Sequence, residues 1–225
     1  ENRVKLAELS GAGVVTDLKS RASFPTSHAL HVRSPSNWVS PLGQEEMMTA
    51  DVIISFDWID LAGSLKPLTP RGGVPGKIVN CTVDSYVHNG WSADHFGLAP
   101  ADIPVLADPD VFVKQLLDAL DAKLGGKSQW DGSAKPKVEA PVQEDKAPDA
   151  KIVPRDIAYA LKEARGHHKL TLTRVPLGWA SESWDFDHPL DYLGNDGGGG
   201  LGSTAGGAIG AALALMETDR NAVAI

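Results

Sequence analysis

The sequence predicts an α/β fold: a parallel-sheet unit with a Rossmann-like order of strands and helices, followed by a second, incomplete α/β unit. Short runs rich in Val and Ile recur through residues 1–125 and predict buried strands. The connections between these runs are long, as crossovers between parallel strands require. Near the C-terminus, a strand-like run, a glycine-rich loop, a small-residue helix and the start of another strand follow in turn. In that order of elements, ligands bind at the carboxyl ends of the strands.

Residues 1–125 are predicted to form the first unit, a central Rossmann-like domain. It opens with a helix that is expected to end at Gly11. A second helix is predicted from Asp108 onward, because apolar residues recur there at helical spacing until Gly125-Gly126 stops them. Between these helices, strands are predicted over residues 13–18, 51–56, 77–83 and 103–107.

Residues 126–151 are predicted to be an interdomain linker, because they are rich in Lys, Ala, Pro and acidic residues and show no apolar period. Residues 152–225 are predicted to form the second unit. Its elements are expected as a helix over 155–165, a strand over 169–173, an irregular aromatic stretch over 174–192, the glycine-rich loop, a helix over 203–216 and the start of a strand over 222–225.

The composition argues against several classes of binding partner. The 225 residues carry a net charge of −8, which argues against binding to nucleic acid or an anionic membrane surface. No run approaches the roughly 20 apolar residues of a membrane span. Cys81 is the single cysteine, which excludes an internal disulfide and favours a cytoplasmic location. The chain begins without Met and ends on residues that indicate a strand hardly begun, so we expect it to be part of a longer polypeptide.

The glycine-rich run from Gly197 to Ser203 carries the strongest functional signal. Backbone without Cβ atoms can adopt positive φ and lets a ligand touch the chain. The helix behind it opens with Ser203 and Thr204, residue types that cap helices, so its free N–H groups and dipole form an anion site. Leu201 is a bulky apolar residue among the glycines. These features favour a cofactor with a phosphate tail and a flat organic body, and the alternative is a flexible glycine linker.

The run GGGGLGSTAGGAIGAALAL, followed by AVAI, resembles the start of the diphosphate-binding domain in thiamine diphosphate-dependent enzymes of the acetolactate synthase and benzoylformate decarboxylase group. Residues 1–125 resemble the central domain of the same enzymes in the segments AELSGAGVVTDLKSRASFPTSHALH, ADVIISFDWIDLAGSLKP and VDSYVHNGW. Order, spacing and linker all agree with that family, so the resemblance covers nearly the whole chain.

The resemblance implies a thiamine diphosphate site in the glycine-rich loop. Leu201 stands where the family has a large apolar residue that bends the cofactor and brings its 4′-amino group near the reactive C2. Gly199 stands where a backbone carbonyl accepts a hydrogen bond from that amino group. The other residues of the implied cofactor site are Gly200, Gly202, Ser203 and Thr204.

The chain also departs from the family pattern. The Gly-Asp-Gly motif, whose Asp helps to hold Mg²⁺, and the Asn ligand downstream would follow Ile225, and the pyrimidine-binding domain with its glutamate is absent. Ala205-Gly206 replaces a Pro-Leu pair, and residues 174–178, where the family has a loop near the diphosphate, match poorly. The resemblance therefore implies that this segment is inactive alone. Its implied partners are the missing pyrimidine-binding domain and the remainder of the diphosphate-binding domain.

The activity implied by the resemblance is the decarboxylation or carboligation of 2-oxo acids by a lyase or transferase that needs thiamine diphosphate and Mg²⁺. Members of the family hold the cofactor between subunits, so a homodimer or homotetramer is implied as well. The alternative function is a non-catalytic module for nucleotide binding or oligomer assembly.

Three acids near predicted strand ends, Asp57, Asp60 and Asp84, occupy positions at which nucleotide riboses are often bound. Some members of the family bind FAD or ADP in the central domain, whereas others bind nothing there. Because no GxGxxG motif follows a strand in this chain, we expect a purely structural central domain.

The histidines give weaker signals. His167 and His168 favour a solvated turn over a metal site, because adjacent side chains point in different directions. His28 and His31 favour packing or hydrogen bonding over metal ligation. His188 precedes the glycine-rich loop and is a further candidate for the active site.

Overall fold

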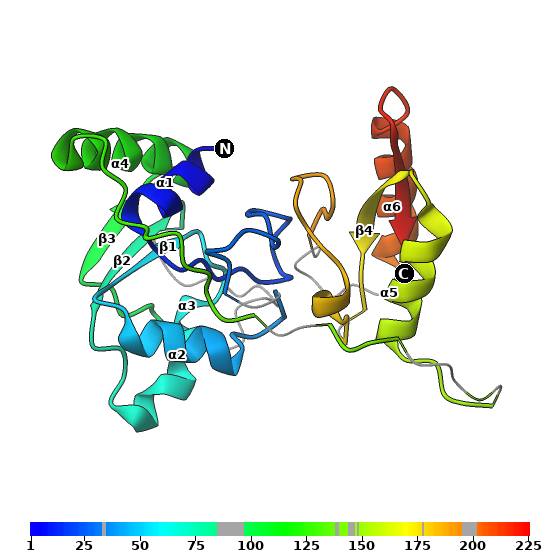
Figure 1. Cartoon of the computed structure of the whole chain (residues 1–225), viewed down its shortest axis with the longest axis horizontal. Coiled ribbons are helices and arrows are strands. Elements are labelled where there is room, and N and C mark those ends of the chain that lie inside the picture. Colours follow the sequence, from blue (N-terminus) through cyan, green and yellow to red (C-terminus); the bar gives the residue numbers. More distant parts are fainter. Residues whose placement is uncertain are drawn as a thin grey trace.

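The computed structural model describes residues 1–32, 35–84, 97–137, 140–143, 147, 149–176, 178–194 and 202–225. It holds two parallel β-sheets that stand at opposite ends of the long axis, with irregular segments between them (Figure 1). Helices accompany both sheets. The predicted α/β class, with a Rossmann-like first unit and a second α/β unit, is confirmed. Among the described residues, no helix combines the length and apolar character needed to cross a bilayer.

The first sheet has the order β1-β2-β3 and all its pairs are parallel. Its strands are β1 (Val52–Phe56), β2 (Lys77–Thr82) and β3 (Ile103–Leu106). Ile54 pairs with Val79, and Cys81 pairs with Val105, so β2 lies in the middle. Three of the four predicted strands are thereby confirmed within about one residue at each end.

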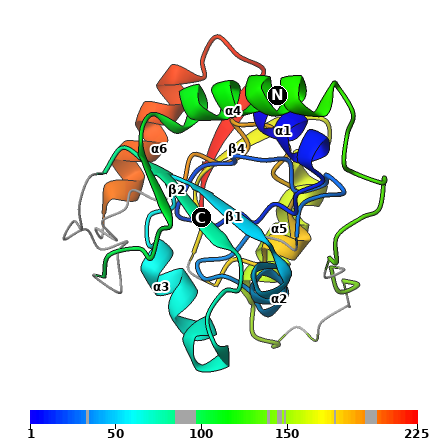
Figure 2. The ribbon, with the colours of Figure 1, turned by 90° about the vertical axis from the view of Figure 1, so that its left-hand side faces the viewer.

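Five helices accompany this sheet: α1 (Asn2–Ser10), α2 (Pro41–Thr49), α3 (Leu61–Leu65), the 3₁₀ helix η1 (Lys66–Arg71) and α4 (Pro109–Leu124). Figure 2 shows α1 and α4 on one side of the strands and α2 and α3 on the other. The carboxylate of Asp108 caps α4 by accepting from the amides of Asp110 and Val111. Gly11 and Gly125 end α1 and α4 in the left-handed conformation, as the sequence predicts.

The predicted strand over residues 13–18 is wrong. The segment forms only two isolated parallel bridges, Val14 with His31 and Asp17 with Ser36. The reason lies in Asp17, whose carboxylate accepts from the backbone amides of Lys19 and Ser20 at 3.1 and 3.0 Å. These bonds turn the chain sharply where a strand would have continued.

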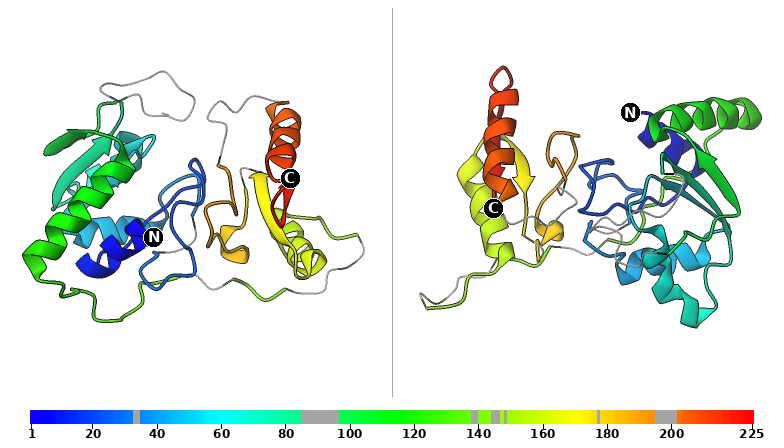
Figure 3. Two further views of the ribbon diagram at one scale, coloured as in Figure 1. Left: turned by 90° about the horizontal axis from the view of Figure 1, so that it is seen from above. Right: turned by 180° about the vertical axis from the view of Figure 1, so that it is seen from behind.

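The second sheet pairs β4 (Lys169–Arg174) with β5 (Arg220–Ala224) in parallel. Helices α5 (Pro154–Arg165) and α6 (Ser203–Ala214) lie on its two faces (Figure 3), and a 3₁₀ helix, η2, spans Ser181–Ser183. Against the prediction, α6 ends at Ala214 and β5 begins two residues earlier than expected. The earlier start follows from the register, because Arg220 pairs with Lys169, the first residue of β4.

A third chain segment extends this sheet on the free side of β4. Tyr192 forms a parallel bridge with Leu172, and the flanking bonds run from Leu172 N to the Asp191 carbonyl (2.9 Å) and from Leu193 N to the Leu172 carbonyl (3.1 Å). The segment 191–193 is thus strand-like, and β4 lies between it and β5.

The predicted irregular stretch 174–192 provides the core of the second unit. Trp179, Trp184, Phe186 and Tyr192 are only 2–6% exposed and pack with Leu172. Leu18, from the first half of the chain, belongs to the same cluster, so the two halves share a core.

The predicted linker contains no helix or strand in its described part. Its first portion lies along the first unit: Gln129 N donates to the Leu9 carbonyl and Lys135 N to the Ala29 carbonyl, both at 2.8 Å. Trp130 packs against the cluster that holds Phe24. The division of the chain at residues 125 and 152 stays a prediction.

Candidate functional site

The amino end of α6 lies at the carboxyl edge of the second sheet. The strand-like segment 191–193 runs parallel to β4 and leads through Gly194 toward Gly202, where α6 begins. α6 then returns along β4 and β5, and β5 starts at the opposite edge beside Lys169. A helix N-terminus at the carboxyl ends of parallel strands is the usual place for an anionic ligand in this architecture.

The start of α6 lacks a side-chain cap. Gly202 occupies the N-cap position with φ 94° and ψ −12°, in the left-handed region that glycine tolerates, and no side chain there accepts from the first turn. The expectation that Ser203 and Thr204 cap the helix is therefore wrong, because both already lie within its first turn. The positive end of the helix dipole at this point suits a negatively charged ligand.

The space next to Gly202 is open. A Cβ atom built on Gly202 would have no neighbour within 4 Å in the described part of the chain, and Ser203 is exposed while Thr204 is half-buried. Of the predicted cofactor residues, the structure thus brings Gly202, Ser203 and Thr204 together at one helix start. Gly199, Gly200 and Leu201 lie outside the described residues, and their roles stay predictions.

The entrance to the loop holds residues that the sequence analysis missed. Tyr192 is 3% exposed, and its hydroxyl donates to the Leu18 carbonyl at 2.9 Å. Gly194 has φ 91°, and its missing Cβ would lie 2.9 Å from the amide nitrogen of Arg21. The only sequence signal was a glycine after an apolar strand end, which many turns share.

At the opposite edge of the sheet, a cavity of about 420 Å³ is lined by Lys169, His188, Leu190, Asp191, Thr218, Asp219 and Arg220. Its charges are matched internally: Lys169 pairs with Asp219 at 2.6 Å, and Arg220 pairs with Asp191. His188, a weaker candidate for the active site, lies at this edge and not beside the start of α6. Its Nδ1 accepts from the Leu190 amide at 3.1 Å.

The other predicted histidine roles agree with the structure. His167 and His168 are exposed in the turn before β4. His31 is fully buried with its Nε2 2.8 Å from the Thr16 hydroxyl, and His28 Nε2 lies 3.2 Å from Glu8. In the described part of the chain, no group of three His, Cys, Asp or Glu side chains could hold a metal ion.

Two of the three acids considered for nucleotide binding serve the backbone of the first sheet. Asp60 caps α3 by accepting from the Gly63 amide at 3.0 Å. Asp57 accepts from the Thr82 hydroxyl at 2.8 Å and from the Val83 amide at 3.3 Å. These bonds give both carboxylates a local structural role.

The chain is similar in sequence to acetolactate synthases. It is 25% identical over 214 residues to the large subunit of Corynebacterium glutamicum, an alignment that covers 91% of this chain and 32% of that protein. It is 23% identical over 226 residues to the acetolactate synthase of Mycobacterium avium, covering 96% of this chain and 34% of that protein. No family model matches the sequence.

The fold is similar to that of benzoylformate decarboxylases. The crystal structure of the enzyme from Polynucleobacter necessarius superposes with a TM-score of 0.70 at 17% identity, over 99% of this chain and 40% of that one. A thiamine diphosphate-dependent 4-hydroxybenzoylformate decarboxylase from Rhodococcus jostii gives a TM-score of 0.65 at 18% identity, over 99% and 39%. The chain is thus similar in sequence to acetolactate synthases and in fold to a thiamine diphosphate-dependent decarboxylase.

Sequence similarity and fold similarity both extend over nearly all of the chain, which agrees with the resemblance drawn from the glycine-rich run and the central segments. The chain spans about a third of the length of the curated relatives that it matches.

Proposed function

We propose that this chain is part of an enzyme that decarboxylates or joins 2-oxo acids with thiamine diphosphate and Mg²⁺, in the manner of acetolactate synthase. The observation that carries the proposal is the position of the α6 start, with Gly202 as its N-cap, at the carboxyl edge of the second sheet and directly after the glycine-rich run. The sequence similarity to acetolactate synthases supports the same chemistry. We assign residues 1–125 to the central domain and residues 152–225 to the start of the diphosphate-binding domain, with 126–151 as the linker.

The residues at the start of α6 would bind the diphosphate end of the cofactor. Ser203 and Thr204 lie in the first turn of α6, at the positive end of its dipole. Gly202 leaves open space beside them, so a diphosphate can approach the backbone closely. The helix dipole adds about half a positive charge at this point.

When bound, thiamine diphosphate supplies a carbanion centre that attacks a carbonyl and stores the resulting electron pair. In this proposal Leu201 would support the cofactor, and the Gly199 carbonyl would accept a hydrogen bond from its amino group. The resemblance assigns the Mg²⁺ ligands to a Gly-Asp-Gly motif and an Asn that would follow Ile225, so we propose that the rest of the polypeptide would supply them. Mg²⁺ requires near-octahedral oxygen ligation.

The surface of α6 supports a larger assembly. Ile209 and Leu213 on this helix, and Met216 just after it, are 64%, 63% and 75% exposed. Neighbouring apolar side chains at such exposure mark a surface that another part of a protein covers. We propose that the remainder of the diphosphate-binding domain covers them, that the pyrimidine-binding domain completes the site, and that the enzyme is a cytoplasmic homodimer or homotetramer. This segment alone would then be inactive.

The central domain is proposed to be structural. The local bonds of Asp57 and Asp60 support this role over FAD or ADP binding. A non-catalytic module for nucleotide binding or assembly remains the competing function, and catalysis distinguishes the two.

The test is a product assay on the full-length protein. Release of CO₂ and formation of acetolactate would be measured over a panel of 2-oxo acids, with and without thiamine diphosphate and Mg²⁺. We expect turnover of at least one 2-oxo acid that is lost when either addition is omitted. Absence of turnover across the panel, together with binding of an adenine nucleotide, would favour the module instead.

A further inference from the structure

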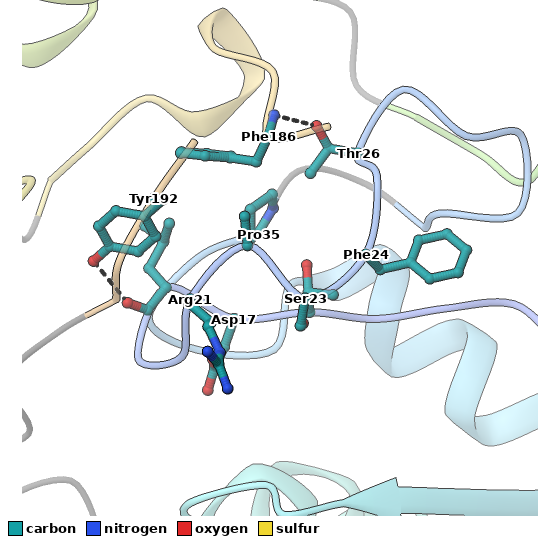
Figure 4. Close-up of a pocket in the computed structure, with 11 residues that line it drawn as sticks. Asp17, Arg21, Ser23, Phe24, Thr26, Pro35, Phe186 and Tyr192 are labelled. Carbon is teal, nitrogen blue, oxygen red and sulfur yellow. Dashed lines mark hydrogen bonds between the residues drawn. The ribbon is translucent and has the colours of Figure 1, made fainter. Parts of the chain in front are cut away.

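A continuous seam joins the first half of the chain to the entrance of the glycine-rich loop. Residues 17–27 lie along residues 186–194, and Figure 4 shows the two segments facing each other. Backbone bonds run from Ala22 N to the Tyr192 carbonyl (3.0 Å) and from Thr26 N to the Phe186 carbonyl (3.1 Å). The Phe186 amide in turn donates to the Thr26 hydroxyl at 2.9 Å. The two segments therefore hold each other at both ends of the seam.

The turn at Asp17 fixes the shape of the first segment. The Asp17 carboxylate, which is 7% exposed, accepts from the amides of Lys19 and Ser20 and from the Ser20 hydroxyl, all within 3.1 Å. These bonds present the Leu18 carbonyl to the Tyr192 hydroxyl, which donates to it at 2.9 Å in the buried interior. Figure 4 shows this bond, and the Tyr192 ring lies 5.5 Å from that of Phe186, centroid to centroid.

Gly194 packs against the same turn. A Cβ on this residue would lie 2.9 Å from the Arg21 amide nitrogen and 3.1 Å from the Ser20 carbonyl carbon, so only glycine permits the approach. Both atoms belong to the backbone and cannot move aside as the end of a side chain could. Gly194, at the entrance of the loop, is therefore in direct contact with the backbone of the turn at Ser20 and Arg21.

The seam contains almost no free volume. The cavity along it measures about 10 Å³, which is room for one water molecule at most. It is therefore a packed contact and not a ligand pocket, and a change on one side is transmitted to the other.

We propose that the turn Asp17–Arg21 is a positioning element for the cofactor loop, acting through Tyr192 and Gly194. This inference rests on the proposed function of that loop. By holding the loop entrance in one arrangement, the first unit raises the fraction of molecules whose site is ready to bind. The apparent dissociation constant of a ligand equals its intrinsic value divided by that fraction, so weakening the seam raises the constant.

The test compares Tyr192→Phe with Tyr159→Phe in the full-length protein. Tyr159 on α5 is a matched control, because its hydroxyl also donates to a backbone carbonyl, that of Pro141, but away from the seam. We expect Tyr192→Phe to raise the dissociation constant of thiamine diphosphate about five- to thirtyfold, the range that follows from losing one buried hydrogen bond. The effect should fall on cofactor affinity and not on turnover at saturating cofactor. Tyr159→Phe should leave the affinity unchanged.

A second pair of variants uses backbone geometry. Gly194→Ala places a methyl group against the turn, whereas Gly132→Ala introduces alanine at a similar φ of 86° where a Cβ meets nothing within 4 Å. Both variants suffer the strain of alanine at positive φ, so their difference reports the contact alone. We expect only Gly194→Ala to weaken cofactor binding and to speed hydrogen exchange in the cofactor-free protein at the amides of Ala22 and Leu193, which donate to the Tyr192 and Leu172 carbonyls.

The outcomes distinguish a failure of the positioning role from a failure of the proposed function. If the wild type binds thiamine diphosphate and Tyr192→Phe binds it equally well, the seam does not position the loop, while the proposed function stands. A lower melting temperature of Tyr192→Phe with unchanged cofactor affinity would likewise overturn the positioning role, because the seam would then contribute to stability only.

If the wild type does not bind thiamine diphosphate, the proposed function fails. Hydrogen exchange then tests the contact between the turn and the loop entrance by itself. Unchanged exchange in Gly194→Ala would overturn the positioning role as well, and faster exchange would support it.

Discussion

The guanidinium of Arg220 donates to the carboxylate of Asp191 and so joins the start of β5 to the segment that enters the glycine-rich loop. The pair is well enclosed, with side chains 6% and 20% exposed. Arg220 also donates to the Thr171 hydroxyl at 2.9 Å and to the Leu170 carbonyl at 2.7 Å. The Arg220 side chain therefore connects β5 to β4 and to the segment 191–193, at the edge of the sheet opposite the candidate site.

Replacing Asp191 with Asn should destabilise the protein by about 3 kcal/mol, because it leaves the buried Arg220 charge without its counter-charge. Chemical denaturation would measure the change. Asp219→Asn is the matched control, since Asp219 pairs with Lys169 at the same sheet edge but the two side chains are 68% and 60% exposed. We expect the control to have a much smaller effect, because exposed ion pairs are screened by water. Equal effects of the two variants would contradict the account of this edge.

The buried Asp17 should make stability depend on pH. Burial raises the pKa of this carboxyl above its ordinary value of 3.8, against the opposing hydrogen bonds from Ser20. The folded protein thus holds the proton more firmly than the unfolded chain, so this contribution to stability is complete below pH 3.8 and is lost as pH rises through the folded pKa. An amide side chain at this position cannot ionise, so the stability of Asp17→Asn relative to the wild type should increase from about pH 4 to about pH 7.

Urea unfolding of both proteins at several pH values measures that difference, and taking the difference cancels all other titrating groups. A constant gap between variant and wild type would show that Asp17 does not titrate differently on folding.

Gly76 should be intolerant of any side chain. A Cβ there would lie 2.3 Å from the Ala50 carbonyl oxygen and 2.6 Å from the Asp51 carbonyl carbon, where the chain approaches β1. We expect Gly76→Ala to cost about 1 to 3 kcal/mol of unfolding free energy, as overpacking does. In Gly178→Ala the new methyl group meets only Pro154 Cγ at 3.8 Å, so that control should change stability by less than about 0.5 kcal/mol. Equal stability of both variants would mean that the two chain segments do not pack as described.

The apolar face of α6 should be covered only in the full-length protein. Ile209→Ser with Leu213→Ser changes side chains that are more than 60% exposed in this chain, so the isolated chain should unfold at nearly the same denaturant concentration. The full-length protein should lose stability or assembly through the same change, as sedimentation and thermal unfolding would show. If this double change alters neither the stability nor the assembly of the full-length protein, the apolar face of α6 is exposed to solvent there.

Much of the fold could be predicted because its signals are local. The helices that end at Gly11 and Gly125 carry their stop signals in the sequence, and the Val- and Ile-rich strands have no competing pattern. The strand predicted over residues 13–18 was wrong because the Asp17 carboxylate accepts hydrogen bonds from backbone amides that would otherwise be available to a strand. The contact of Gly194 with Arg21 links residues far apart in the chain, and no local pattern reveals such a pair.

Part of the candidate site could be predicted because its sequence signal is also local. Glycines before a small-residue helix indicate an anion site wherever they fall, and the structure places that helix start at the carboxyl edge of a parallel sheet. The cap itself was mispredicted, because Gly202 takes the N-cap position in a left-handed conformation that glycine tolerates, which places Ser203 and Thr204 inside the first turn.

Leu201 should matter for turnover more than for folding. In the full-length protein, Leu201→Gly removes the apolar support proposed for the bent cofactor, so we expect turnover to fall at least tenfold at saturating cofactor. The melting temperature should change no more than in Leu98→Gly, a control at a loop leucine that is 76% exposed. Turnover equal to that of the control would rule out the proposed role of Leu201.

The most direct measurement is the affinity of the full-length protein for thiamine diphosphate with Mg²⁺, by calorimetry, in the wild type and in Ser203→Asp. A carboxylate in the first turn of α6 favours the helix by about 0.3 to 1 kcal/mol but repels a diphosphate at the same amides. We therefore expect Ser203→Asp to have unchanged or higher stability and to bind thiamine diphosphate at least tenfold more weakly. Asn221→Asp on β5, which adds the same charge, should bind the cofactor as the wild type does. Equal affinity of Ser203→Asp and wild type, or no affinity in either, would contradict the assignment of the α6 start to the cofactor.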